Sequence, residues 1–262
     1  MIQPGRNAMK HTAVLLFAML LLGFTFAANP RHTRKRDDNV KRGLFTVVEG
    51  DVKKKQITAE EWIRAQKNAD VNGGDRVRTL LQSRAEMQLA QLDVIRLAPQ
   101  TTIDIVKLYE ETKDKKIQTQ LNLKEGDIWG KVKSVDANST FEVNSDFAGA
   151  AITGTVFRVS HDSAAAETQL KVYTGEVRIS NVPEKMDALT PQSVAPTRIE
   201  GPRQIQGPTQ ISVEEWLYLV KSYQQITIGR NGAVKSKGAF KRTDRDEASD
   251  WVRWNLQRDR LR

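Results

Sequence analysis

The chain of 262 residues has no cysteine and only three histidines. Without cysteine there are no disulfides, no thiolate metal ligands and no thiol nucleophile. His11 and His32 lie near the N-terminus, and His161 falls in a predicted surface loop, where a lone histidine is usually solvated. No GxSxG or GxxxxGK[ST] motif occurs, so neither a nucleophile elbow nor a phosphate-binding loop is indicated. The sequence therefore predicts a protein that is not an enzyme and uses no cofactor or metal.

A long apolar run is also missing. Residues 12–26 are almost continuously apolar, but about 20 residues are needed to span a bilayer. Arg6 and Lys10 precede this run, and Ala27 and Ala28 follow it. This order is typical of a secretory signal peptide. We therefore predict a signal over residues 1–28 with cleavage at Ala27 or Ala28. An uncleaved inner-membrane anchor, and translation from Met9 instead of Met1, remain open alternatives.

The net charge of +9 is concentrated at the two ends of the chain. Residues 43–229 carry a net charge of −2, whereas residues 29–42 and 230–262 are strongly basic. A polar, basic segment without periodicity predicts disorder for residues 29–42. We interpret this arm first as a solvated tether. The alternative is contact with anionic lipid or polysaccharide through Arg31, Arg34, Lys35 and Arg36. Nucleic acid is not expected, because the folded middle lacks clustered cations.

The most regular stretch is residues 74–99, where apolar and polar residues alternate. Ala85, Met87 and Leu89, for example, alternate with charged or amide residues. A period of two predicts strands with one apolar and one solvated face. Glycine and proline at the two ends of the stretch are typical turn residues. We expect three short antiparallel strands here, with bends near residues 80–83 and 90–93.

The order of these motifs resembles the FecR domain family of bacterial cell-envelope proteins. Family-like segments occur at residues 48–50 (VEG), 74–79 (GDRVRT), 83–86 (SRAE), 95–99 (IRLAP), 123–132 (LKEGDIWGKV), 154–157 (GTVF) and 170–179 (LKVYTGEVRI). The family often has arginine where this chain has Thr153. The resemblance covers roughly residues 44–181 and implies a β-rich envelope module, with Trp129 as a packing residue. FecR-type proteins also include transmembrane regulators that act with sigma factors.

Other segments are expected to be helical or extended. A capping box at Thr58 and Glu61 predicts a short helix to about Lys67. Residues 182–211 contain five of the eight prolines, which predicts an extended linker or wrap. A helical stripe over residues 213–223 and a capped helix over 245–261 predict C-terminal helices. Ile226 and Ile228 fit one added strand, and residues 230–243 a basic loop.

The expected fold is mainly β, a curled antiparallel roll or sandwich of about ten strands with a short inserted helix and appended C-terminal helices. The expected segments are a signal peptide (1–28), a basic arm (29–42), a FecR-like domain (43–181), a Pro-rich linker (182–211) and a helical extension (212–262). Trp216, Trp251 and Trp254 are expected to dock the helices on the sheet or to bind a partner.

We interpret the chain as a periplasmic or secreted binding or scaffold module whose partner is an envelope protein or polymer. Two alternatives remain. One is a FecR-like regulator in transmembrane signalling of the sigma and anti-sigma type. The other is a protein that binds polyanions through its basic ends. The sequence does not identify the ligand or the oligomeric state.

Overall fold

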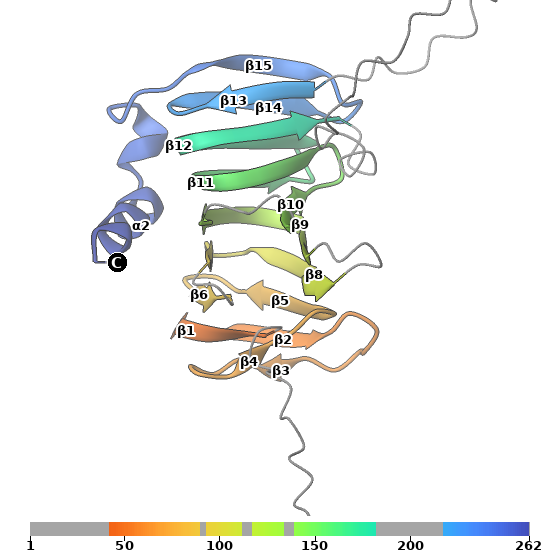
Figure 1. Cartoon of the computed structure of the whole chain (residues 1–262). Helices are drawn as coiled ribbons and strands as arrows, with labels where there is room; N and C mark the ends of the chain where they lie inside the picture. The colour runs from red at the N-terminus through yellow and green to blue at the C-terminus, as the bar shows by residue number, and fades with distance from the viewer. Residues whose placement is uncertain (1–41, 90–92, 112–116, 134–138, 182–216, 262) are drawn as a thin grey trace, which may run out of the picture. The chain divides into compact units, whose positions relative to one another are not determined.

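β-strands dominate the computed structural model (Figure 1), which describes residues 42–89, 93–111, 117–133, 139–181 and 217–261. All of these residues belong to one compact unit, Asp38–Arg262; the other unit, Met1–Asp37, lies outside the described residues. The strands are β1 (Gly43–Glu49), β2 (Val52–Gln56), β3 (Ile63–Arg64), β4 (Asp70–Val71), β5 (Asp75–Thr79), β6 (Arg84–Gln88), β7 (Val94–Leu97), β8 (Thr102–Glu111), β9 (Ile117–Lys131), β10 (Ser139–Asn144), β11 (Gly149–Asp162), β12 (Glu167–Ser180), β13 (Leu217–Lys221), β14 (Gln224–Gly229) and β15 (Val234–Ala239).

The strand pairings form two series. The first runs β3–β2–β5–β8–β9–β10–β11–β12–β13, and the second runs β4–β1–β6–β7–β9–β11–β12–β14–β15. Both series contain β9, β11 and β12, which contribute one half of their length to each. Among the described strands, every pairing is antiparallel except that of β9 with β10. The predicted mainly β, curled fold is confirmed, with fifteen strands in the described residues instead of about ten.

Glycines mark the points where the three long strands pass from one series to the other. Gly126, Gly154 and Gly175 all have positive φ, at 94°, 64° and 86°. A Cβ atom at Gly126 would lie 2.4 Å from Thr101 Oγ1, so a side chain there would clash as well as strain the backbone. Gly175 is a bend inside the continuous strand β12, and not the tight turn between two strands that the segment LKVYTGEVRI suggests.

Apolar and polar residues alternate along the strands, so the apolar side chains of both series point into the space between them. Val77, Ile103 and Leu121 of the first series and Met87 and Ile95 of the second are at most 1% exposed and share one core. The next residue along each second-series strand points the other way. This pattern predicted β5, β6 and β7 correctly. The expectation that the opposite face of β6 and β7 is solvated is wrong, because the C-terminal segment covers it.

A 3-10 helix, η4 (Arg245–Ala248), and an α-helix, α2 (Asp250–Arg260), form the C-terminal segment. The helix begins after Ser249, whose side chain accepts a hydrogen bond from the amide of Val252 at 3.4 Å. The predicted helix over 245–261 is therefore confirmed in part. Its α-helical portion starts later than expected, because the residue that caps it is Ser249.

The predicted helix over residues 58–67 is wrong. Residues 57–62 form a turn and irregular structure, and β3 follows. Arg64 lies opposite Lys53 of β2, and the Ala65 amide donates to Val52 O at 2.8 Å. A ten-residue helix with so few apolar residues could bury little surface. Sheet pairing therefore overrides the capping signal.

The predicted C-terminal helices before residue 245 are also wrong within the described residues. Residues 217–221 form β13, which pairs with β12, and Tyr223 at φ 62° makes the turn into β14. Only Val220 of β13 is buried, so the expected helical stripe does not form one face. The strand predicted at Ile226 and Ile228 is confirmed as β14. The basic loop expected over 230–243 contains the exposed strand β15.

His161 is not in a solvated loop. It lies in β11 and is 1% exposed, and its Nδ1 is 2.9 Å from Thr168 Oγ1 of β12. The hairpin of β11 and β12 continues to the pair Asp162 and Glu167, further than the sequence indicated. A small loop remains at residues 163–166.

Candidate functional site

The outer side of the second strand series is a charged and aromatic surface covered by η4 and α2. We call it the helix-docking face, and its residues are Glu86, Arg96, Asp127, Trp129, Arg158, Lys171 and Tyr173. They come from β6, β7, β9, β11 and β12, at positions that alternate with core residues. Trp129 and Tyr173 pack with Phe240, Trp251 and Val252 in a second apolar cluster.

The first half of this face is an ion-pair network centred on Glu86 and Arg96. Both side chains are 0% exposed, and Arg96 Nε donates to Glu86 Oε2 at 2.7 Å. From α2, Arg258 Nε donates to the same oxygen at 2.9 Å, and Asp259 accepts from Arg96 Nη1 at 2.8 Å. Trp129 Nε1 donates to Asp259 at 3.0 Å. The end of α2 is thus bonded to two strands through buried charges.

Glu86 ionises more easily than an ordinary glutamate. Burial disfavours its charged form, but hydrogen bonds from Arg258, Thr46 and Arg96 outweigh burial and lower its pKa to about 2. The Thr46 hydroxyl donates to Glu86 Oε1 at 2.6 Å. The carboxylate therefore stays charged at neutral pH and serves as an acceptor, not as a proton donor.

The second half of the face is a network around Asp127, Arg158 and Lys171. Arg158 Nε donates to Asp127 Oδ2 at 2.7 Å, and its Nη1 donates to Asp246 of η4 at 2.8 Å. Lys171 Nζ contacts Asp246 at 2.7 Å and Glu247 at 2.9 Å. These cations bind η4 as Arg96 binds α2.

Tyr173 completes the second network. Its hydroxyl donates to Glu247 Oε2 at 2.9 Å. Burial and the nearby Glu247 carboxylate raise the pKa of the Tyr173 phenol above its ordinary value. Tyr173 is therefore neutral at physiological pH and can act as a hydrogen-bond donor.

Two of the three tryptophans singled out from the sequence lie in the described residues. Trp251 is 7% exposed, and its Nε1 donates to Asp127 Oδ1 at 2.9 Å. Trp254 stacks on Trp251 with ring centroids 5.6 Å apart, and the guanidinium of Arg258 lies 5.0 Å from its ring. Both rings face the sheet of their own chain. Partner binding through them stays a prediction.

Several other predicted residues lie outside the described residues. These are Ala27, Ala28, Arg31, Arg34, Lys35, Arg36 and Trp216, together with residues 1–28, the Pro-rich segment 182–211 and almost all of the basic arm. No helix within the described ranges is long and apolar enough to cross a membrane.

The buried charges of the helix-docking face are bonded mainly to one another. Arg96 Nη2 is an exception, because it has no hydrogen-bond partner among the described residues. The described residues contain no group of three or more His, Asp or Glu side chains placed to hold a metal ion. The arrangement is suited to holding the C-terminal segment in place.

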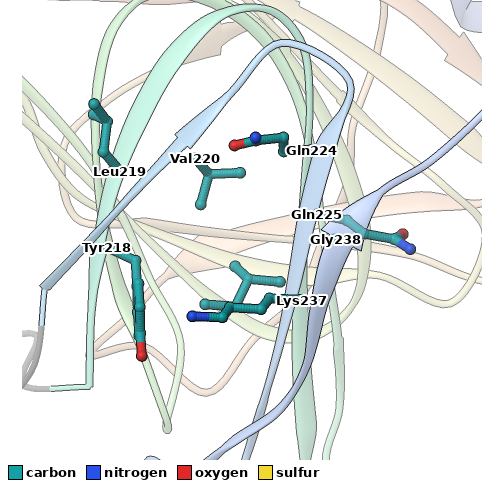
Figure 2. Close-up of a pocket in the computed structure, with 8 residues that line it drawn as sticks. Tyr218, Leu219, Val220, Gln224, Gln225, Lys237 and Gly238 are labelled. Carbon is teal, nitrogen blue, oxygen red and sulfur yellow. The ribbon is translucent and has the colours of Figure 1, made fainter.

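A hollow of about 320 Å³ lies at the end of the molecule formed by β13, β14 and β15 (Figure 2). It is lined by Tyr218, Leu219, Val220, Gln224, Gln225, Ile226, Lys237 and Gly238. Lys237 Nζ lies 4.6 Å from the centre of the Tyr218 ring. We call this hollow the open end. Its lining comes from β13, the last strand of the first series, and from β14 and β15, the last two strands of the second. Gln224 and Gln225 supply amide groups, and Lys237 supplies a cation.

Sequence reasoning found the strands of the helix-docking face but not its role. Glu86 and Arg96 belong to the SRAE and IRLAP segments, and they lie opposite each other on β6 and β7. Their partners Arg258 and Asp259 are more than 160 residues away along the chain. The one sequence signal for this pairing is the presence of both acidic and basic residues in the last turns of the predicted C-terminal helix.

Comparison with known proteins finds a family model that matches part of the β-rich region. The FecR protein family model matches residues 75–178. Two crystal structures of a protein from Parabacteroides distasonis, designated a candidate anti-sigma factor, align with 15% identity and TM-scores of 0.43 and 0.42. Each alignment covers 63% of this chain and 59% of the other, which is less than two thirds of that protein. No curated protein matches the chain.

The matched region runs from β5 to within β12 and includes Glu86, Arg96, Trp129, Arg158 and Tyr173. The η4 and α2 segment that binds these side chains lies beyond it. The ordered motifs predicted this resemblance, and the family match confirms it over residues 75–178, the part of the chain that matches the FecR protein family model.

Proposed function

We propose that this FecR-domain protein is a non-enzymatic binding module of the bacterial cell envelope. The observation that carries the proposal is the use of the buried charges in the FecR domain. Glu86, Arg96, Arg158 and Lys171 are bonded to the C-terminal segment. A domain whose strongest polar groups hold its own structure presents a rigid surface, and rigid surfaces lower the entropic cost of binding.

Export is part of this proposal. It is supported by the signal-like residues 1–28 in the sequence. Intact mass and cell fractionation of the full chain in a bacterial host test it. The mass of a chain whose first residue is Ala28 or Asn29, measured in the periplasmic or secreted fraction, supports export. A full-length mass in the cytoplasmic fraction contradicts it, and a full-length mass in the inner membrane indicates an anchor.

Site-specific photo-crosslinking in the same cells tests partner binding. A crosslinker replaces Leu219 at the open end, Gln257 on α2 or Arg78 on the first strand series, one position at a time. One crosslinked species of defined mass that forms from a single position supports a binding module with one recognition surface. Crosslinks of equal yield from all three positions indicate nonspecific encounter and contradict the proposal.

A regulator of transmembrane signalling is the second candidate. The family match favours it, because FecR-type proteins include such regulators. Deletion of the gene, followed by measurement of the transcripts that depend on each sigma factor of the host, tests this function. A change confined to one sigma factor's transcripts, restored by the full chain, supports it. Unchanged transcripts leave the scaffold function as the better account.

A further inference from the structure

The outer face of the first strand series carries a row of cations that the FecR assignment does not explain. Arg64 of β3 lies opposite Lys53 of β2, and Lys53 lies opposite Arg78 of β5. We call Arg64, Lys53 and Arg78 the cation ladder. Neighbouring strands are about 4.8 Å apart, so three positive charges stand in line over about 10 Å.

The side chains of the ladder point away from the core. Lys53 and Arg78 alternate with Val52 and Val77, which are 0% exposed and belong to the core. Arg64 and Arg78 are exposed, and Lys53 is partly exposed. Two residues along β2, on the same face, Lys55 lies opposite Arg76 and extends the basic surface.

Acidic residues neutralise little of this charge. Lys53 has a contact of 3.8 Å with Asp51, in which both side chains are exposed by more than 40%. Arg76 is fully paired with Asp104, at 2.5 and 2.7 Å. Within the described ranges, no carboxylate lies within ion-pair distance of Arg64 or Arg78, although the exposed Glu60 and Glu61 are nearby in sequence.

An aromatic ring holds part of the basic surface in place. The guanidinium of Arg78 lies 4.5 Å from the centre of the Trp62 ring, and Lys55 Nζ lies 5.3 Å from it. Cation–π contacts of this kind order the long side chains before any ligand arrives. Less conformational entropy is then lost on binding.

Like charges directly opposite each other destabilise a sheet. Protection of an open edge could explain a basic residue on β3, which is short and lies at the edge. It does not explain Lys53 or Arg78, because β2 and β5 have neighbours on both sides. Repulsion between Lys53 and Arg78 therefore destabilises the free protein at positions where no edge needs protection. An anionic ligand bound there would remove this repulsion.

We propose that the cation ladder binds a linear polymer with closely spaced anionic groups, such as an anionic glycan or a polyphosphate. A row of three cations matches a dense line of charge, and release of the polymer's condensed counterions then favours binding. An acidic protein segment that binds by strand addition fits less well, because β2 already pairs with β3 and β5 and the open edge strand β3 is only two residues long. This site is separate from the basic ends and goes beyond the proposed function.

Binding of labelled heparin and labelled polyphosphate to the purified full chain tests the proposal. The ladder variant is K53Q/R64Q/R78Q, and the matched control is K221Q/R230Q/K241Q, which removes three exposed cations elsewhere. A second control, R31Q/R34Q/K35Q/R36Q, removes the charges of the basic arm. We expect the ladder variant to bind at least tenfold more weakly, and each control less than threefold.

The salt dependence gives a second, quantitative readout. Each neutralised cation contributes about 0.7 to the slope of log K against log salt for a single-stranded polymer. The ladder variant should therefore lose about 2 from that slope, and its melting temperature should no longer rise with added polymer.

Each alternative result overturns the proposal in a different way. Equal weakening by the ladder and control variants would assign binding to net charge. Loss confined to the arm variant would assign it to residues 29–42. Displacement of heparin by poly-L-glutamate at equal charge concentration would indicate an acidic protein partner. If the triple variant unfolds, the single variants Lys53→Gln and Arg78→Gln replace it, with an expected loss of at least twofold each.

Discussion

The outer faces of the two strand series carry similar charged residues but use them in opposite ways. On the helix-docking face, Glu86 and Arg96 are 0% exposed and bonded to α2. On the cation ladder, Arg64, Lys53 and Arg78 stand opposite one another, all positive, with their charge almost unneutralised. Where a face carries charges of both signs, the chain's own C-terminal segment neutralises them. Where a face carries charges of one sign, the chain leaves them unneutralised, and we propose an external anionic ligand.

The largest expected effect of a single substitution is on the helix-docking face. Arg96→Ala removes the inner partner of Glu86 and of Asp259, and removing one partner of a buried ion pair typically costs about 3–5 kcal/mol. We expect a loss of this size in the free energy of unfolding, measured by urea denaturation. Arg64→Ala on the ladder should change it by less than about 0.5 kcal/mol.

Replacement of both buried charges sharpens this result. Glu86→Leu with Arg96→Met leaves no isolated buried charge on the strands, and Arg258 can turn toward solvent because it is partly exposed. The double variant should therefore be more stable than Arg96→Ala alone. Additive losses would mean that the pair is not coupled and that the network contributes only packing.

Acid should distinguish the two faces in a second way. Glu86 has a folded pKa of about 2 and a reference pKa of 4.5. Its contribution to stability is therefore fully present above about pH 4.5 and is lost as the pH falls to 2, by about 3 kcal/mol. Urea denaturation between pH 2 and 6 measures this loss. Glu86→Gln should be less stable than the parent at pH 6 and approach it near pH 2, whereas K53Q/R64Q/R78Q should keep the parental pH dependence.

Local sequence patterns predicted the strands because their causes are local. The alternation around Met87 and Ile95 requires only that one face of each strand meets the core. The turn residues between these strands add backbone constraints within a few positions. The opposition of Glu86 and Arg96 also follows once the hairpin of β6 and β7 is assumed.

Contacts distant in sequence account for the errors. The capping box at Thr58 is a real local signal, but a short polar helix is marginal by itself, and the chain pairs β3 with β2 instead. Leu217 and Leu219 read equally well as part of a helical stripe or of a strand, and β12 decides between them. The burial of Glu86 depends on a helix that starts 164 residues later. No short window of sequence contains that information.

Substitution of Trp129 tests how much one hydrogen bond, from Trp129 Nε1 to Asp259, contributes to holding α2 against the sheet. Trp129→Phe keeps an aromatic ring beside Tyr173, whose ring centroid is 4.3 Å away, but removes the Nε1 bond to Asp259. Hydrogen bonds to charged groups contribute about 1.5–3 kcal/mol, so we expect a loss in that range in urea denaturation. Asp259→Asn in the Trp129→Phe background should then cost less than it does in the parent. Equal costs in both backgrounds would show that Trp129 and Asp259 act independently.

The smallest expected effect has the opposite sign and falls on the ladder. Lys53 faces Arg64 on one side and Arg78 on the other, so Lys53→Gln removes two like-charge oppositions at once. Cross-strand charge pairs contribute about 0.2–1 kcal/mol, and we expect the variant to be more stable than the parent by that amount in low salt. The gain should disappear near 0.5 M salt, because screening weakens the same repulsion in the parent. A destabilised variant in low salt would mean that the contact of Lys53 with Asp51 outweighs the repulsion, and the ladder would then have no cost for a ligand to remove.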